Sequence, residues 1–147
     1  VLREELELLQ SYLSIQKIRF PKRLQVRETI EDETLDCLVP TLLLQPLAEN
    51  AVRHGIEPKA EPSTLLISSR LLDNSRIELV VEDDGIGWEN TPTQSDSREG
   101  FGLSNIKSRL EALHTGESVV TISTPPGGGT RIVICFPAKS RIETAIE

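Results

Sequence analysis

The sequence predicts an α+β fold: a two-layer α/β sandwich in which a mixed, mostly antiparallel sheet carries its helices on one face. Two pairs of Leu-, Ile- and Val-rich segments are each joined by a short turn pattern, which predicts two hairpins. Three other segments have apolar residues at helical spacing, and one of them lies between the hairpins. A hairpin sheet must bury one apolar face, and helices on that face can bury it. The 147 residues predict one domain core.

The first element is predicted to be a helix over residues 1–18. Its apolar positions recur at steps of four, three and four, which is the spacing of one helix face: Leu2, Leu6, Leu9 and Leu13. This seam fits two arrangements equally well, packing on the domain's own core or contact within a bundle or dimer. Phe20-Pro21 ends the helix, and the alternation that follows predicts a strand over residues 24–30.

A second helix is predicted over residues 41–55, with an apolar stripe on one side and polar residues on the other. Pro46 lacks a backbone N–H, so we expect the first turn to be kinked or the helix to start late. Gly55 is the expected C-cap, because glycine adopts the left-handed conformation that often ends a helix.

The rest of the chain predicts strands, one helix and polar loops. The turn residues at 73–75 and the Pro- and Gly-rich segment at 125–129 close the two hairpins. The elements, in chain order, are strands 64–69 and 77–82, a polar loop 88–99, a helix 103–114, strands 119–123 and 130–136, and a flexible tail 139–147.

Composition excludes several functions. There are 23 acidic and 16 basic residues, a net charge of −7, and only five aromatic residues, so the chain lacks the basic clusters and stacking platforms of nucleic-acid binders. No signal peptide is present, and no apolar run approaches the ~20 residues that span a bilayer. We therefore expect a soluble, cytoplasmic domain without direct membrane contact, which a membrane anchor could precede in a longer protein.

One acidic turn has the features of a ligand site. The strand at 77–82 leads into Asp83, and Gly85 and Gly87 follow at alternate positions. A carboxylate at a strand end can accept a hydrogen bond from a ligand's amino group, while glycines let a flat ring come close to the backbone. The alternative is a purely structural acidic turn.

Two further segments carry residues that suit phosphate and magnesium. Gly100 and Gly102 stand directly before the helix that starts at Leu103, whose first N–H groups could bind an anion. In the second helix, Asn50 can supply a neutral oxygen to Mg²⁺, and Arg53 can neutralise phosphate charge. For Arg53 and Glu49 an exposed ion pair at i,i+4 spacing is the alternative.

Together these motifs resemble the ATP-binding domain of sensor histidine kinases. Residues 44–55, Leu-Gln-Pro-Leu-Ala-Glu-Asn-Ala-Val-Arg-His-Gly, resemble the asparagine box in the form of the LytS-type subfamily. Asp83-x-Gly85-x-Gly87 is similar to the first glycine box. Gly100-x-Gly102-Leu103-x-Asn105 is similar to the second, and Gly129-Thr130 to the last element. The resemblance extends from Val1 to Pro137.

The resemblance implies the Bergerat ATP-binding fold, shared with gyrase, MutL and heat-shock chaperones, and it implies ATP and Mg²⁺ as ligands. Asp83 would read the adenine amino group with support from Thr130, and Asn50 would coordinate Mg²⁺. Arg53 and His54 would meet the phosphates, and residues 88–99 would form a short lid. The candidate catalytic residues are Asn50 and Glu49. The candidate nucleotide-binding residues are Asn50, Arg53, His54, Asp83, Gly85, Gly87, Gly100, Gly102, Leu103 and Thr130.

The resemblance also implies partners. Residues 1–20 would be the C-terminal part of a dimerisation or linker helix, residues 21–138 the catalytic domain, and the full-length protein a homodimer through its dimerisation helix. A response regulator of the LytTR DNA-binding class would receive the phosphoryl group.

Neither His54 nor His114 matches the family's phosphoacceptor histidine, so we expect ATP binding without autophosphorylation. Pro46 occupies the position of the general-base Glu of hydrolytic relatives, which disfavours rapid hydrolysis. Two alternatives stay open, a Ser-directed kinase of the anti-sigma type and a degenerate nucleotide-binding interaction module.

Overall fold

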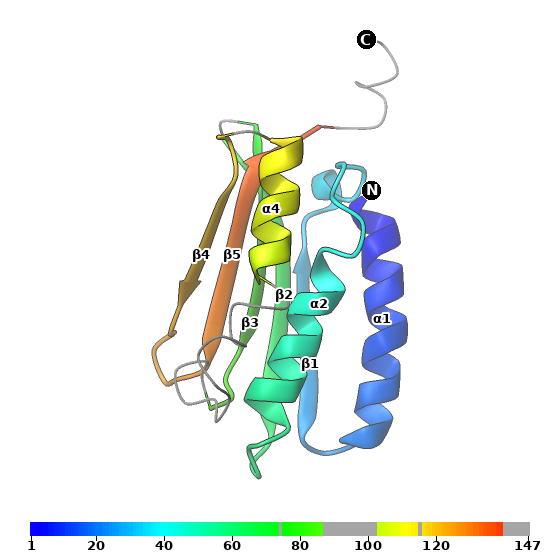
Figure 1. Cartoon of the computed structure of the whole chain (residues 1–147). Coiled ribbons are helices and arrows are strands. Elements are labelled where there is room, and N and C mark those ends of the chain that lie inside the picture. Colours follow the sequence, from blue (N-terminus) through cyan, green and yellow to red (C-terminus); the bar gives the residue numbers. More distant parts are fainter. Residues whose placement is uncertain (74, 87–102, 115, 140–147) are drawn as a thin grey trace.

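A five-stranded mixed sheet with its helices on one face forms two layers (Figure 1). The structure, a computed structural model, describes residues 1–73, 75–86, 103–114 and 116–139. The elements are α1 (Leu2–Arg19), β1 (Leu24–Ile30), a 3₁₀ turn η1 (Asp32–Thr34), α2 (Leu44–Asn50), a π-helix η2 (Ala51–Ile56), β2 (Ser63–Leu72), β3 (Arg76–Asp83), α4 (Leu103–Leu113), β4 (Val119–Ser123) and β5 (Thr130–Pro137).

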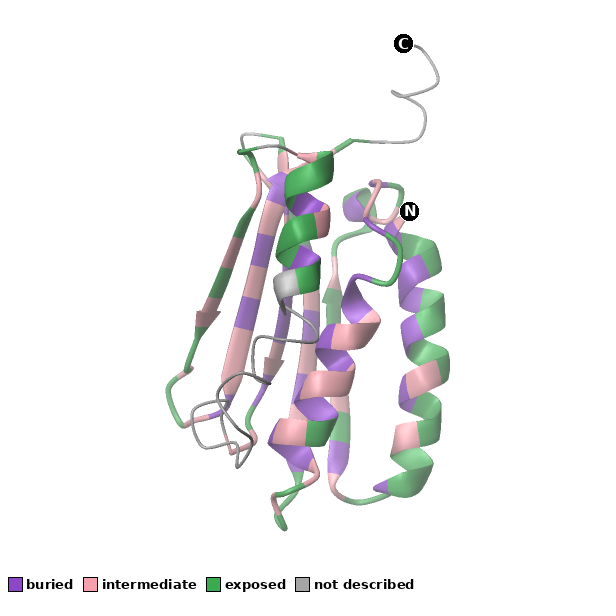
Figure 2. Cartoon of the chain, viewed as in Figure 1, coloured by how far each residue is buried: buried purple, intermediate pink, exposed green. Residues whose placement is uncertain are grey.

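The sheet has the order β1-β2-β3-β5-β4. β1 runs parallel to β2, and the other neighbours are antiparallel, so the predicted mixed, mostly antiparallel sheet is confirmed. Alternate residues of β2, β3 and β5 are buried beneath the helices, as the banding of the strands in Figure 2 shows. This two-residue period means that the inward-facing positions of β3 end with Asp83.

The leucine seam of α1 packs on the domain's own core. Its four leucines are buried in the same cluster as Leu65, Leu79 and Phe136 of the sheet: Leu2, Leu6, Leu9 and Leu13. Of the two arrangements that the spacing allows, the structure therefore has the core-packed one for this face. The opposite face of α1 exposes other apolar side chains: Leu8, Ile15 and Ile18.

The second helix starts at Leu44, three residues after the start expected from the apolar stripe. Pro46 falls in its first turn, where backbone N–H groups have no intrahelical partner, so the missing donor costs little. The late start expected from Pro46 is confirmed.

The interpretation of Gly55 as a C-cap is wrong. The helix continues from α2 into η2 without a break, Gly55 lies inside this π-helix, and the residue that follows the helix is Glu57. The Glu57 N–H donates to the Val52 carbonyl five residues earlier (N···O 2.8 Å), as in a π-turn. Packing against β3 explains why glycine is needed here, as described below.

Three expectations fall on residues outside the described ranges: the lid at 88–99, the second glycine box before Leu103, and all of the predicted tail beyond Lys139. Where the structure does describe the chain, none of its helices combines the length and apolar composition of a membrane span.

Candidate active site

Asp83 lies at the end of β3 and faces the helix layer. Asp83 is only 4% exposed. It is a charged residue at the end of a row of buried positions that are otherwise apolar. The backbone N–H of Gly85 donates to its Oδ1 (N···Oδ1 2.9 Å), and the Thr130 N–H, across the ladder on β5, also hydrogen-bonds to it. A carboxylate offers about four acceptor sites, so these two donors leave capacity for a ligand donor.

Burial raises the pKa of Asp83 from 3.8 to about 6. Desolvation is the main cause, and the nearby charges of Asp84 and Glu82 add to it, while the hydrogen bonds from Gly85 and Thr130 oppose it. The carboxyl group is thus still ionised at pH 7 but is costly to keep ionised. A buried, under-compensated charge of this kind is typical of a functional site.

Three glycines allow unusually close backbone approaches at and around Asp83. A Cβ on Gly55 would lie 2.6 Å from Asp83 Oδ1, and one on Gly85 would lie 2.1 Å from the Gly55 carbonyl oxygen. Gly129 has φ +97°, and its Cβ would lie 1.9 Å from the Asp83 carbonyl oxygen. The Ile86 N–H donates to the Gly55 carbonyl (N···O 3.1 Å), which fixes η2 against the end of β3.

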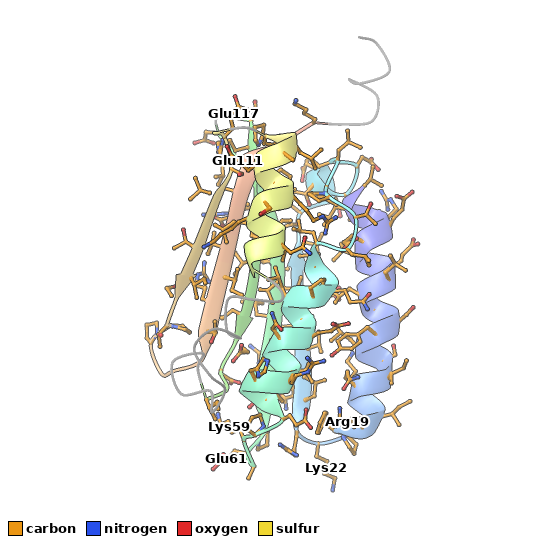
Figure 3. The ribbon with its side chains drawn as sticks, in the orientation of Figure 1. Arg19, Lys22, Lys59, Glu61, Glu111 and Glu117 are labelled. Atoms are coloured by element: carbon orange, nitrogen blue, oxygen red, sulfur yellow. The ribbon has the colours of Figure 1, made fainter. Side chains whose placement is uncertain are left out.

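Asp84 has a different role from Asp83. It is exposed, and its Oδ1 accepts a hydrogen bond from the Thr64 N–H at the start of β2 (N···Oδ1 2.7 Å). The Lys59 ammonium donates to its backbone carbonyl (Nζ···O 2.9 Å), and Figure 3 labels Lys59 at this end of the molecule. Asp84 therefore ties the strand ends together, so the structural interpretation of the acidic turn fits this second carboxylate.

The α2–η2 helix brings the asparagine-box residues to the same end of the sheet. Asn50 is half-buried and lies five residues before Gly55, the residue whose Cα faces the Asp83 carboxylate. Among the described residues the Asn50 amide has no hydrogen-bond partner, so its oxygen is available to a cation. No group of three His, Cys, Asp or Glu side chains in the described ranges could hold a metal alone, and a cation here would take most ligands from water and phosphate.

His54 and Arg53 follow on η2. His54 is half-buried, and burial followed by the charge of Arg53 lowers its pKa below 6.5, so the imidazole is neutral at pH 7. Arg53 is exposed, so its guanidinium can reach an anion in solvent. A neutral imidazole beside a guanidinium can offer hydrogen bonds to phosphate oxygens without adding charge repulsion.

Glu49 points to a hollow between α1 and the α2–η2 helix. This hollow has a volume of about 190 Å³ and is lined by Tyr12, Gln16, Arg19, Glu49, Val52, Arg53 and Glu57. Glu49 accepts a hydrogen bond from Gln45 (Nε2···Oε1 3.1 Å), so within the described residues its hydrogen-bonding partner is Gln45 and not Arg53. The i,i+4 ion pair with Arg53, the alternative left open by the sequence, is therefore absent from that part of the chain.

Not every predicted site residue can be placed. Gly87, Gly100 and Gly102 lie outside the described residues, as does the side chain of Leu103, whose backbone starts α4. Thr130 lies directly across from Asp83 in the β3–β5 ladder, so the two side chains share the inward face. Sequence reasoning missed the contacts of Gly55 and Gly129 with Asp83, for which only the glycines themselves gave a signal.

Comparison with known proteins identifies similar chains. The family model described as "Histidine kinase-, DNA gyrase B-, and HSP90-like ATPase" matches residues 38–140. The sensor histidine kinase YesM of Bacillus subtilis is 34% identical over 141 residues, which cover 96% of this chain and 24% of YesM. The sensor protein LytS of Bacillus anthracis is 34% identical over 146 residues, 94% of this chain and 25% of LytS.

Solved structures share the fold. Histidine kinase ThkA, in a crystal structure with the response regulator TrrA, superposes with a TM-score of 0.63 at 15% identity, covering 94% of this chain and 40% of that one. The chain spans about a quarter of the length of YesM and of LytS.

Proposed function

Because this chain belongs to the histidine kinase-, DNA gyrase B- and HSP90-like ATPase family and is the ATP-binding catalytic domain of a sensor histidine kinase, we propose that its site holds Mg²⁺-ATP for transfer of the γ-phosphoryl group to a histidine. The observation that carries the proposal is the Asp83 carboxylate, which is buried at a strand end, lies against the backbone of Gly55, and has two N–H donors among the described residues for about four acceptor sites.

Asp83 is proposed to accept the adenine amino group, with Thr130 beside it on the inward face of the sheet. A hydrogen bond to a charged acceptor contributes roughly 1.5–3 kcal/mol. Gly85 and, by the resemblance, Gly87 would give the ring access to the backbone. The tight contact at Gly55 supports this assignment, since any side chain at this position would collide with the carboxylate.

Asn50 is proposed to coordinate Mg²⁺, and Arg53 and His54 to meet the phosphates, together with the helix N-terminus at Leu103 and the glycines at 100 and 102. The cation would neutralise phosphate charge when bound. Catalysis would rest on positioning and electrostatic stabilisation, with Asn50 and Glu49 next to the transferred group. Glu49 opens onto the α1 side of its helix, which is consistent with an acceptor approaching from that side.

The phosphoacceptor is proposed to be a histidine on an upstream dimerisation helix of a longer protein. Neither histidine of this chain suits that role. His54 lies within η2, and His114 is half-buried with its ring stacked on Phe136 (centroids 5.3 Å apart). The chain alone should therefore bind ATP without phosphorylating itself.

The remaining partners are proposed from the relatives. ThkA was crystallised with its response regulator TrrA, and a response regulator, of the LytTR class by the LytS resemblance, is the proposed acceptor of the phosphoryl group here. The full-length protein is proposed to be a membrane-anchored homodimer whose catalytic domain faces the cytoplasm.

Two measurements test the proposal. Isothermal titration of the chain with Mg²⁺-ATP should show one site, and absence of binding would leave only a structural role. Addition of a peptide or protein that carries the upstream helix should then yield a phosphoprotein that is labile in acid and stable in alkali. An acid-stable product would identify a Ser-directed kinase instead.

A further inference from the structure

The helix that carries Asn50 has no cap of its own at its N-terminus. The capping position is Leu43, whose side chain cannot accept a hydrogen bond, and Leu42 before it has φ +56°. A non-glycine residue rarely adopts this left-handed conformation, and the first N–H groups of a helix need acceptors. Something outside the local sequence must therefore hold this turn.

Glu5 of α1 supplies the missing cap. Its Oε2 accepts from the Leu42 N–H and its Oε1 accepts from the Leu44 N–H, both at 3.0 Å. Although Glu5 carries a charge, it is only 4% exposed and lies on the buried face of α1. The two N–H groups and the positive end of the helix dipole compensate its charge.

Arg23, which follows α1, caps the other end of the same helix. Its Nη2 donates to the carbonyl oxygens of Ile56 (3.2 Å) and Glu57 (2.9 Å), and also to that of Lys59. A guanidinium at the carbonyl end again matches the helix dipole. Arg19 adds an ion pair to Glu57 (2.8 Å), with Arg19 labelled at the lower end of α1 in Figure 3, but both side chains are exposed and contribute little.

Asn50 lies midway between these two caps. From Leu44 to Ile56 the helix is continuous, and near its end Gly55 contacts Asp83. We infer that Glu5 and Arg23 are positioning residues: they fix the position of the α2–η2 helix along its axis relative to Asp83. In this way they set where Asn50 meets the magnesium of bound nucleotide. This inference rests on the proposed function of Asn50. It also implies that a displacement of α1 along its axis moves Asn50 relative to the adenine site.

The test is the gain in nucleotide affinity that Mg²⁺ provides. For the 147-residue chain, the Kd of a non-hydrolysable ATP analogue is measured with EDTA and with Mg²⁺. The ratio of the Kd in EDTA to the Kd in Mg²⁺ is then compared between variants. Glu5→Gln should reduce this ratio at least about threefold, the order of one lost hydrogen bond, because its NH₂ group replaces one of the two carboxylate oxygens and cannot accept from the N–H that faces it. The affinity for adenosine should stay within about twofold, since β3 and β5 hold Asp83.

Three variants make the result specific. Glu7→Gln, on the exposed side of α1, should leave the ratio unchanged. Leu42→Gly added to Glu5→Gln should restore part of the ratio, because glycine adopts the φ of +56° without help. Arg23→Lys, which keeps the charge but lacks the reach and planar donor geometry of the guanidinium that contacts these carbonyls, should lower the ratio independently.

The outcomes separate this inference from the proposed function. If the unmodified chain gains no affinity from Mg²⁺, the proposed role of Asn50 fails and this inference fails with it. If the chain gains affinity and both Glu5→Gln and Arg23→Lys keep the full gain, only the positioning role is refuted. An equal loss of adenosine and nucleotide affinity in these variants would show a merely structural role and would also refute it.

Discussion

Replacement of Asp83 by Asn should make the nucleotide-free domain more stable while it weakens nucleotide binding. The carboxylate is 4% exposed, and its pKa is raised from 3.8 to about 6, mainly by desolvation. A folded-state pKa near 6 means that the folded protein holds the proton more tightly than the unfolded chain does. The ionised carboxylate therefore opposes folding at neutral pH, and an amide at the same position does not.

The magnitude follows from the pKa. The difference between 3.8 and about 6 corresponds to at most about 3 kcal/mol at 1.36 kcal/mol per pH unit. This cost is fully present above pH 6, shrinks as the pH falls from 6 to 4, and is absent below pH 4, where Asp83 is protonated in both states. At pH 8 Asp83→Asn should thus raise the free energy of unfolding by about 1–3 kcal/mol, with the gain vanishing near pH 4.

Urea denaturation of both proteins at each pH unit from 4 to 8 measures the difference. Asp84→Asn is the matched control, because Asp84 is exposed and its structural hydrogen bond from Thr64 can be kept by an amide oxygen. Mg²⁺-ATP affinity should fall about 10- to 100-fold in Asp83→Asn and much less in Asp84→Asn. A stability difference that does not change with pH, or equal losses of ATP affinity in both variants, would refute the reasoning.

Further predictions concern the same site and the core. The affinity for adenosine, which has no phosphate to titrate, should fall towards tenfold per pH unit below pH 6 as Asp83 is protonated, as NMR titration can show. Gly55→Ala should cost about 1–3 kcal/mol and weaken ATP binding in calorimetry, whereas Gly116→Ala, which is strained by the φ of +72° but contacts nothing at the site, should leave binding unchanged. Leu9→Ala should cost about 2–5 kcal/mol in urea denaturation and Leu8→Ala within about 0.5 kcal/mol, since Leu9 is 0% and Leu8 49% exposed; equal costs would contradict the packing of α1.

Most of the fold follows from periodicity. The strand and helix patterns predict the described helices and strands to within a few residues, because apolar spacing reports which face of each element is buried. The same period of two separates the two acidic residues of the turn: Asp83 shares the face of Val81 and is buried, and Asp84 points the other way. The nucleotide-reading candidate was thus accessible from sequence once the strand was located.

The contacts that hold the asparagine-bearing helix were not accessible in this way. Gly55 fits a C-cap and a close backbone approach equally well, and only the neighbouring β3 decides between them. Glu5 is recognisable in the sequence as an acidic residue within a leucine seam. Its role as an acceptor, however, depends on the turn at Leu42, which lies 37 residues away in sequence. Long-range hydrogen bonds of this kind have no local pattern to predict them.

The features at the end of β3 share one physical property, which is that each lowers the stability of the empty fold. Among the described residues the buried charge of Asp83 has two N–H donors for about four acceptor sites, and Gly129 beside it requires a positive φ. Backbone approaches at Gly55 and Gly85 exclude the side chains that would otherwise fill the space. Such costs are concentrated where a ligand, and not the core, completes the interactions. Bound nucleotide should therefore stabilise this end of the domain more than any other part, because it supplies the donor that the carboxylate lacks.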